Sequence, residues 1–361
     1  MKGTQRLHEA GQSIWLDNIT RGILTNGTLA RYVKELSVTG LTSNPTIFDQ
    51  AIAKSADYDK AIREKTAAGK AGEALFFELA IDDLQQAADL FRPAHEATNR
   101  VDGWVSLELS PTLAYDTAGS VAAAKALHAA AGRPNLFIKI PGTKEGAPAI
   151  EEAIFAGVPI NVTLLFSREQ YLAAAEAYIR GVERRVAARL NPYVPSVASV
   201  FVSRWDVAVA EKVPPALAGQ LGIAVAKRTY RAYRELLASD RWLRLLNFGA
   251  RSQRLLWAST GTKDPKLSDQ LYVKSLAAPH TINTMPEKTL VALADHGDVG
   301  PMLPHDGGDA EEVLGRFTKA GIDLDALAAE LQRDGAASFV KSWEDLLRAI
   351  SDKSATLAKT G

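Results

Sequence analysis

Short apolar runs alternate along this chain with longer, alanine-rich stretches whose apolar residues recur at the period of a helix. Eight runs have the length and residue types of β-strands, and they lie at residues 13–18, 38–44, 105–110, 136–141, 158–166, 197–203, 254–259 and 281–285. Strands that alternate with helices are typical of a parallel sheet covered by helices. Eight such units predict an α/β fold of the (β/α)₈ barrel type.

Helices outside the repeated units are expected in two places. One helical region, at about 58–97, lies between the second and third strands, and further helices follow Pro286. No long polar or Pro/Gly-rich stretch interrupts the chain as a domain linker would. We therefore expect a single domain over residues 1–361, with C-terminal helices at about 287–361 added to the barrel.

Two helix starts carry a sequence signature of their own. Ser167 with Gln170, and Thr284 with Glu287, have the spacing of a capping box, in which two side chains satisfy the first free backbone N–H groups of a helix. These pairs predict helices that begin directly after the fifth and eighth strands.

The strands differ from those of an ordinary barrel because one of their two faces is polar. Ser106 and Glu108 alternate with apolar residues in the third strand, and Asn161 and Thr163 do so in the fifth. Barrel interiors are normally filled with branched apolar side chains, and active sites lie at the carboxyl ends of the strands. Further polar residues on the same face and toward the same strand ends are Asp17, Lys139 and Ser199. The pattern predicts a polar, chemically active interior.

Lys139 is the most reactive candidate, because desolvation in an apolar strand favours the neutral amine, which is a nucleophile. Such an amine traps a carbonyl substrate as a Schiff base, an electron sink for making or breaking the neighbouring carbon–carbon bond. The alternative is a lysine that reaches solvent from the strand edge. Asp17 and Asn44 also have local alternatives, as caps of a turn or a helix start. Taken together, however, buried carboxylates beside a buried lysine must be paired or hydrogen-bonded, because an apolar interior would be cheaper to build. A lysine, two carboxylates, a threonine and an asparagine around one site are the set that Schiff-base chemistry requires.

The amino-acid composition limits the classes of binding partner that we expect for this protein. Lys+Arg and Asp+Glu number 42 each, so no overall field attracts nucleic acid or a membrane surface, although a local basic pocket for a small anion remains possible. The chain has no cysteine, and its six histidines have no metal-ligand spacing, so no metal is expected. The polar start and the lack of an apolar stretch of bilayer length predict a soluble protein that is not exported.

Two motifs resemble those of the transaldolase family. The segment 40–48, GLTSNPTIF, is similar to the family motif around the second strand, and the segment 138–146, IKIPGTKEG, is similar to the motif that holds the Schiff-base lysine. Shorter matches occur in the strands that contain Asp17, Glu108, Asn161 and Ser199. The resemblance spans roughly residues 13–285, and the chain length is similar to that of the long-chain subfamily of these class I, Schiff-base enzymes.

The resemblance implies a role for each matching residue. Lys139 is expected to form the Schiff base, and Asp17 to act as acid and base on the substrate hydroxyl whose deprotonation drives cleavage. Glu108 and Thr163 are expected to hold and activate the catalytic water.

The resemblance also implies substrate ligands. Asn44 and Asn161 would bind hydroxyls of a dihydroxyacetone unit, with Ser199 beside them. Arg204 would bind the substrate phosphate, for which its fork of N–H donors is well suited.

The chain departs from the family pattern near the seventh strand. Short members carry a second phosphate-binding arginine two residues beyond the position of Ser259, where this chain has Gly261. The hydroxyls and backbone N–H groups from Ser259 onward, with the ammonium group of Lys263, are the expected replacement.

The implied function is that of a cytoplasmic, cofactor-free transaldolase of the pentose phosphate pathway. It would move a dihydroxyacetone unit between sedoheptulose 7-phosphate or fructose 6-phosphate and glyceraldehyde 3-phosphate or erythrose 4-phosphate. One alternative is a lyase of the fructose 6-phosphate aldolase type, although such lyases have an uncharged residue at the position of Glu108. The other is a non-catalytic barrel that binds phosphosugars.

Overall fold

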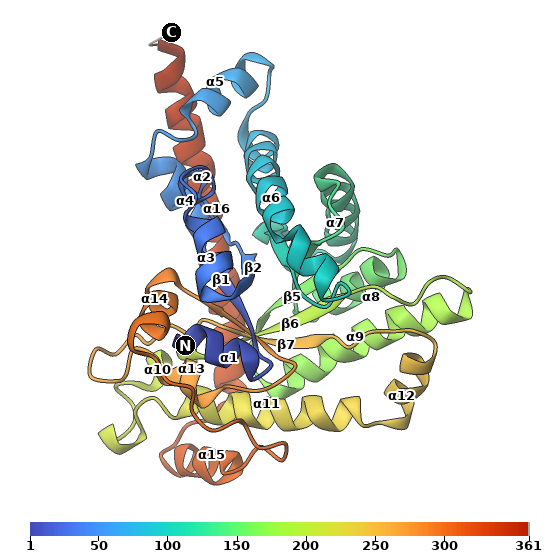
Figure 1. Ribbon diagram of the computed structural model, residues 1–361, viewed down its shortest axis with the longest axis vertical. Coiled ribbons are helices and arrows are strands. Elements are labelled where there is room, and N and C mark those ends of the chain that lie inside the picture. The colour runs from blue at the N-terminus through green and yellow to red at the C-terminus, as the bar shows by residue number, and fades with distance from the viewer. Residues whose placement is uncertain (360–361) are drawn as a thin grey trace.

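The computed structural model describes residues 1–359, in which eight parallel strands close into a barrel in chain order (Figure 1). The strands are β1 (Ser13–Asp17), β2 (Val38–Thr42), β3 (Trp104–Glu108), β4 (Leu136–Pro141), β5 (Ile160–Leu165), β6 (Ser196–Phe201), β7 (Arg254–Ala258) and β8 (Ile282–Met285). Pairing of β1 with β8 closes the ring. The predicted (β/α)₈ barrel is confirmed, and every predicted strand overlaps an observed one.

Helices surround the barrel. Helix α1 (Gly3–Glu9) precedes β1. The other helices that alternate with the strands are α2 (Arg21–Thr25), α3 (Thr28–Leu36), α7 (Thr117–Ala131), α8 (Gly146–Phe155), α9 (Arg168–Ala187), α10 (Ser203–Val209), α11 (Leu221–Leu237), α12 (Asp240–Asn247), α13 (Leu271–Ser275) and α14 (Glu287–His296). The additional helices are α4 (Pro45–Lys54), α5 (Asp59–Ala67), α6 (Gly72–Ala97), α15 (Ala310–Lys319) and α16 (Leu324–Lys359). Both predicted sets of extra helices are present, and the first begins earlier than expected, with α4.

Of the two predicted capping boxes, only the first forms. The Ser167 hydroxyl accepts a hydrogen bond from the backbone N–H of Gln170, and the Gln170 side chain accepts one from the backbone N–H of Ser167. The prediction for Thr284 was wrong, because this residue still belongs to β8 and its hydroxyl lies 2.7 Å from that of Thr42 in β2, on the other side of β1. Pro286, with φ fixed at −59°, precedes α14 instead.

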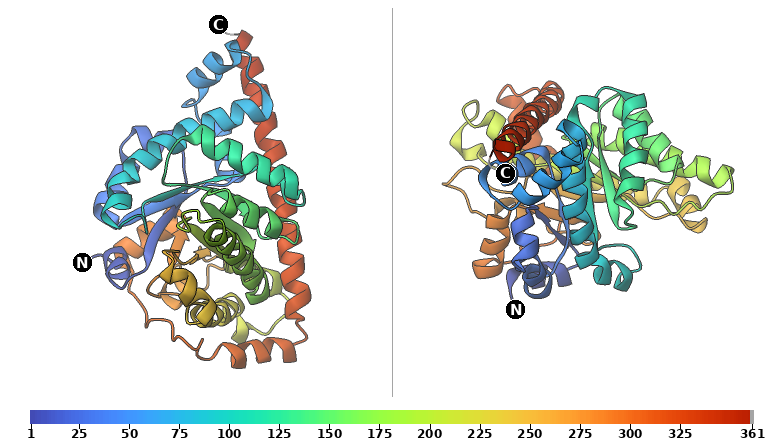
Figure 2. Two further views of the ribbon diagram at one scale, coloured as in Figure 1. Left: turned by 90° about the vertical axis from the view of Figure 1, so that its right-hand side faces the viewer. Right: turned by 90° about the horizontal axis from the view of Figure 1, so that it is seen from above.

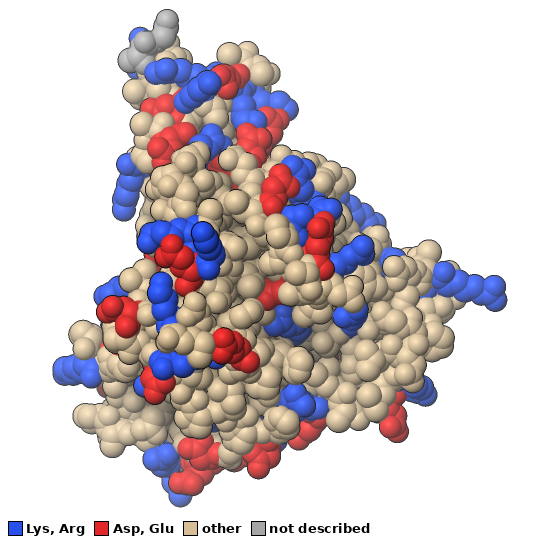
Figure 3. Space-filling view, viewed as in Figure 1, with Lys and Arg blue, Asp and Glu red and all other residues tan. Residues whose placement is uncertain are grey.

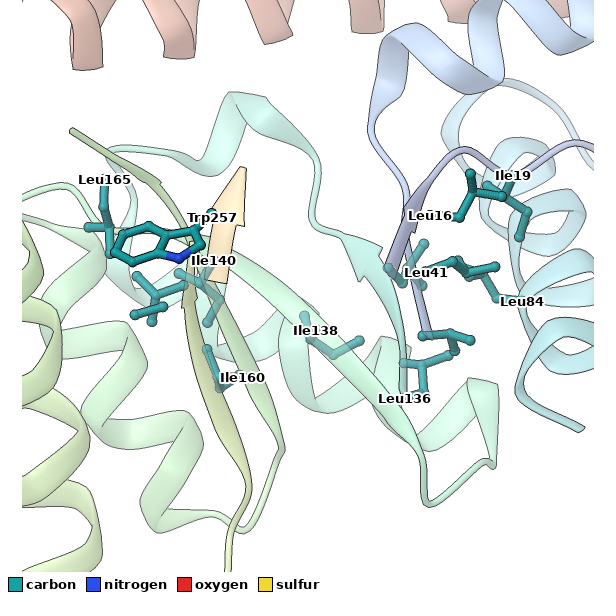
Figure 4. Close-up of a cluster of buried hydrophobic side chains, with 14 of the residues drawn as sticks. Leu16, Ile19, Leu41, Leu84, Leu136, Ile138, Ile140, Ile160, Leu165 and Trp257 are labelled. Atoms are coloured by element: carbon teal, nitrogen blue, oxygen red, sulfur yellow. The ribbon is translucent and has the colours of Figure 1, made fainter. Parts of the chain in front are cut away.

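The two faces of the strands are buried differently. Outward-facing side chains such as Leu41, Ile138 and Ile160 pack in the layer between strands and helices (Figure 4). Inside the barrel, the Trp104 and Phe137 rings stack with centroids 4.1 Å apart, and the Trp15 ring lies 6.2 Å from that of Phe137. Trp104 and Phe137 are the first and second residues of their strands, and Trp15 pairs in register with Gly40, which pairs with Trp104. The aromatic layer therefore fills the amino-terminal half of the interior and leaves the carboxyl-terminal half to polar side chains.

The long helix α16 passes over the carboxyl end of the barrel, while α1 lies on the opposite side (Figure 2). With 36 residues it is about 54 Å long. Its Gln332 side chain donates hydrogen bonds of 3.0 and 2.9 Å to the carbonyls of Gly142 and Leu164. Gly142 directly follows β4, and Leu164 is the second-last residue of β5. Leu164 has φ of 58°, a rare conformation for a branched side chain. Helix α16 thus fixes a strained strand end directly beside the polar interior.

Candidate active site

The polar half of the interior opens into a cavity of about 120 Å³ at the carboxyl ends of the strands. Eight of the residues predicted as site residues line it: Asp17, Asn44, Lys139, Thr163, Ser199, Arg204, Ser259 and Lys263. Glu108 and Asn161 do not line this cavity but are buried behind it. The structure therefore brings side chains from distant parts of the sequence to one small space, because the carboxyl ends of all parallel strands in a barrel meet there.

Lys139 and Glu108 form a buried ion pair. The lysine Nζ lies 3.0 Å from Glu108 Oε2 and 2.9 Å from the backbone carbonyl oxygen of Ser43, and each charged residue is only 5% exposed. Burial raises the pKa of Glu108 above its usual value, although the Lys139 charge opposes the shift. Glu108 Oε1 has no hydrogen-bond partner among residues 1–359. This arrangement lets the carboxyl group exchange a proton with the amine and leaves one oxygen for another group.

Asp17 is the second carboxyl group at the cavity. Its Oδ1 accepts a hydrogen bond of 2.8 Å from the Thr42 hydroxyl. Burial raises the pKa of Asp17, and the positive charge of Lys139 is the strongest of the opposing effects. A carboxyl group with a raised pKa is able to work as acid and base near neutral pH.

Asn161 holds its neighbours in position. The Ser199 hydroxyl donates a 2.7 Å hydrogen bond to Asn161 Oδ1, and Asn161 Nδ2 donates one of 3.1 Å to the Ser106 hydroxyl. The hydroxyl of Thr163, by contrast, is buried and has no partner within the described part of the chain. The Ser199 hydroxyl is thereby fixed on Asn161 while the residue lines the cavity, and Thr163 keeps its hydrogen-bonding capacity for a ligand.

Asn44 caps a helix and also lines the cavity. Its Oδ1 accepts a hydrogen bond of 3.1 Å from the backbone N–H of Ile47 and so caps α4, which starts with Pro45. The same residue lines the cavity. The helix cap fixes the direction of the side chain, and the amide nitrogen remains available to a ligand.

Arg204 provides a positive charge at the cavity. Its guanidinium lies 5.2 and 5.8 Å from the ring centroids of Phe201 and Phe339. Burial lowers the pKa of Arg204, against the effect of the Glu108 and Asp17 charges. No carboxylate lies within ion-pair distance of Arg204 in residues 1–359. A guanidinium that lies near two aromatic rings and has no carboxylate partner is well placed to bind an anion.

The residues that follow β7 form a further part of the cavity wall. Lys263 is exposed at the cavity, and the hydroxyl of Ser259 lies 2.8 Å from that of Ser203. A side chain at position 261 would begin 3.1 Å from Pro286, which is tight. An arginine in place of Gly261 would therefore require the Pro286 ring to shift by a few tenths of an ångström.

Several cavity residues were not predicted. Thr42, Phe201 and Thr284 lie on the inward face of their strands, so strand alternation could have identified them. Phe339 comes from α16, and no sequence pattern shows which helix crosses the barrel. No cluster of three or more potential metal-ligating side chains occurs in residues 1–359, and no helix there is long and apolar enough to cross a bilayer.

Comparison with known proteins is consistent with this geometry. The family model described as "Transaldolase/Fructose-6-phosphate aldolase" matches residues 14–350. A protein named "Transaldolase" from Saccharopolyspora erythraea is 45% identical over 97% of both chains, and one from Thermobifida fusca is 44% identical over 97% of both. "Transaldolase 2" from Nostoc punctiforme is 40% identical over 96% of both. The chain therefore belongs to the transaldolase/fructose-6-phosphate aldolase family.

Proposed function

We propose that this protein is a cytoplasmic transaldolase of the pentose phosphate pathway that works without a cofactor. The observation that carries the proposal is the buried contact of 3.0 Å between Lys139 and Glu108 beside the second carboxyl group, Asp17. An amine next to a proton acceptor is the arrangement that Schiff-base formation needs, and a separate acid–base group is what carbon–carbon cleavage needs.

In the first stage, Lys139 gives a proton to Glu108 and its amine attacks C2 of the ketose phosphate. Glu108 returns a proton to the carbinolamine hydroxyl, which leaves as water when the iminium forms. The free oxygen of Glu108 and the unpartnered hydroxyl of Thr163 support a role for this pair in holding that water.

In the second stage, Asp17 accepts the proton of the C4 hydroxyl. The electrons of the C3–C4 bond move to the iminium nitrogen, so an aldose phosphate leaves and an enamine stays on Lys139. The enamine carbon then attacks the carbonyl of the acceptor aldehyde, and Asp17 returns its proton to the new hydroxyl. Hydrolysis of the new iminium, with Glu108 as the base for water, releases the product. The raised pKa of Asp17 supports this dual role.

The remaining side chains bind the substrate. Asn44 and Ser199 bond the hydroxyls of the three-carbon unit, and Asn161 acts mainly by orienting Ser199. Arg204 holds the phosphate, and Lys263 with the Ser259 hydroxyl completes the anion site. The donors and acceptors are sedoheptulose 7-phosphate, fructose 6-phosphate, glyceraldehyde 3-phosphate and erythrose 4-phosphate.

Release of glyceraldehyde 3-phosphate from fructose 6-phosphate, measured with and without erythrose 4-phosphate, tests this function. A transaldolase requires the acceptor. Equal release without the acceptor would indicate a fructose 6-phosphate aldolase-type lyase. Binding of fructose 6-phosphate without any release would indicate a non-catalytic phosphosugar-binding barrel.

A further inference from the structure

A second and larger cavity, of about 650 Å³, lies at the amino-terminal end of the barrel, opposite the candidate active site. Its walls are the starts of strands, such as Ser13 and Arg254, together with residues of α11 and α12 and the loop 98–102. Lining residues belong to or directly follow α1, α11 and α6, which Figure 1 labels. Trp104 and Phe137, which separate it from the polar interior, form its floor.

The charges around this second cavity are unbalanced. Four arginines line it: Arg100, Arg234, Arg251 and Arg254. The one carboxylate in the lining, Asp102, already accepts hydrogen bonds of 2.8 and 2.7 Å from Trp15 Nε1 and the Thr39 hydroxyl. None of the four arginines has a carboxylate within 4.0 Å in the part of the chain that the structure describes, although Arg184 and Arg241 elsewhere each contact two.

Figure 3 shows that acidic and basic side chains are interspersed over the face seen there, so the excess of positive charge among the cavity residues is not repeated over that face as a whole. A local group of cations in a recess attracts a small anion, whereas a flat basic surface would attract a polyanion.

Arg254 is the innermost of these arginines and is only 9% exposed. Its guanidinium donates to neutral groups alone: the carbonyls of Val101 and Thr281, at 3.2 and 3.0 Å, and the hydroxyl of Ser13, at 2.7 Å. A buried charge with only neutral partners has lost hydration without gaining a counter-charge. An anion in the cavity would supply that counter-charge.

Other lining residues indicate the rest of the ligand. Trp104, Phe137 and Trp242 present aromatic surface, and Leu237 and Leu246 add aliphatic surface. Such walls favour a flat ring over a bare inorganic ion.

A buried amide in the lining points to a ligand independently of the charges. The Gln12 side chain is fully buried, and its Nε2 donates to the Leu276 carbonyl and the Thr281 hydroxyl. Its Oε1 has no partner within residues 1–359. This oxygen is ready to accept a hydrogen bond from a ligand hydroxyl.

We propose that this amino-terminal cavity binds a small organic phosphate that carries a ring, with the phosphate at the arginines and the ring against Trp104 and Trp242. A phosphate monoester matches the geometry of several guanidinium groups, and the volume is adequate for a ligand of this size. The site is separate from the active-site residues and does not depend on the proposed function.

Calorimetric titration of the full-length protein with phenyl phosphate, inorganic phosphate and phenol tests the proposal. We expect saturable binding of phenyl phosphate, weaker binding of inorganic phosphate and none of phenol. The double variant Arg234→Gln/Arg251→Gln should weaken phenyl phosphate binding at least tenfold. The matched variant Arg31→Gln/Arg63→Gln removes the same charge from exposed residues outside the cavity and should bind as the wild type does.

Two further variants keep the result interpretable. Arg204→Ala removes the active-site arginine and should leave phenyl phosphate binding at this site intact, whereas loss of all binding in that variant would assign the phosphate to the active site and overturn the proposal. If the double variant does not fold, the single variant Arg251→Glu takes its place; this change on the cavity wall should abolish binding of phenyl phosphate. Unchanged affinity in the Arg251 variants, or equally tight binding of phenol, would also overturn it.

Discussion

The substitution Glu108→Gln isolates the proton transfers of Schiff-base chemistry. Glutamine has nearly the same shape and still accepts a hydrogen bond from Lys139, but it neither takes the proton of the amine nor delivers one to the carbinolamine. In residues 1–359, Glu108 is the one carboxylate within 4.0 Å of the Lys139 ammonium group. The variant therefore removes the immediate proton acceptor and keeps the packing.

The expected loss follows from this geometry. General acid–base catalysis contributes roughly 10²–10⁴-fold to a rate, or about 2.7–5.4 kcal/mol of transition-state free energy. Glu108 and Lys139 are each only 5% exposed, so bulk water has little access to replace the missing carboxylate. We therefore expect a loss of about 10³-fold or more in the rate of Schiff-base formation.

Rapid-quench trapping with borohydride measures this rate directly. Glu108→Gln should form the adduct of fructose 6-phosphate slowly, and the adduct should then be cleaved at a rate closer to that of the wild type. Asp17→Asn is the matched control, because it neutralises the other carboxyl group; it should form the six-carbon adduct but accumulate it uncleaved. If instead Asp17→Asn cleaves normally and Glu108→Gln accumulates the six-carbon adduct, the roles assigned to the two carboxyl groups are reversed.

Three further predictions concern stability and binding. Burial raises the folded-state pKa of Asp17 above its unfolded value, so the stability that this group contributes is present below its unfolded pKa and is lost as pH rises through the folded pKa. In urea unfolding, Asp17→Asn should therefore be more stable than the wild type at pH 7 and lose that advantage near pH 3. Equal stability of the two proteins at both pH values would contradict this effect of burial. Arg204→Ala should raise KM for phosphorylated donors by roughly 30- to 900-fold, the equivalent of about 2–4 kcal/mol, without a similar effect on an unphosphorylated donor, whereas equal losses would indicate a structural arginine. Gln332→Leu should destabilise the protein by about 1–3 kcal/mol and speed hydrogen exchange in α16, because two strand-end carbonyls lose their donor; unchanged exchange would refute this role.

The sequence predicted the site residues best where the alternation of residues along a strand also decides which side chains face the barrel interior. Alternation in the strands predicted that Asp17, Lys139 and Ser199 face one interior, because a strand offers only two faces and the apolar residues occupy the other. The parallel barrel then brings their carboxyl ends together. The capping-box spacing, by contrast, was misleading at Thr284, because β8 continues past this residue and its hydroxyl lies 2.7 Å from that of Thr42.

Features that depend on the approach of distant elements were beyond sequence analysis. Phe339 reaches the active site only because α16 passes over the barrel, and α16 is fixed there by Gln332 and by the packing of Trp343 on Phe76. The amino-terminal cavity is likewise formed by loops and helix ends that no periodicity connects. A buried arginine such as Arg254 is ambiguous in a sequence, because its partners are carbonyl groups that any residue supplies.

The central claim is that Lys139 forms the covalent intermediate, and borohydride reduction in the presence of fructose 6-phosphate followed by peptide mass spectrometry tests it most directly. We expect a three-carbon or six-carbon mass on Lys139 and no adduct in Lys139→Met. The variant Lys144→Met, which removes an exposed lysine of the same motif, should still be labelled. An adduct on another lysine, or transfer activity that persists in Lys139→Met, would contradict the account.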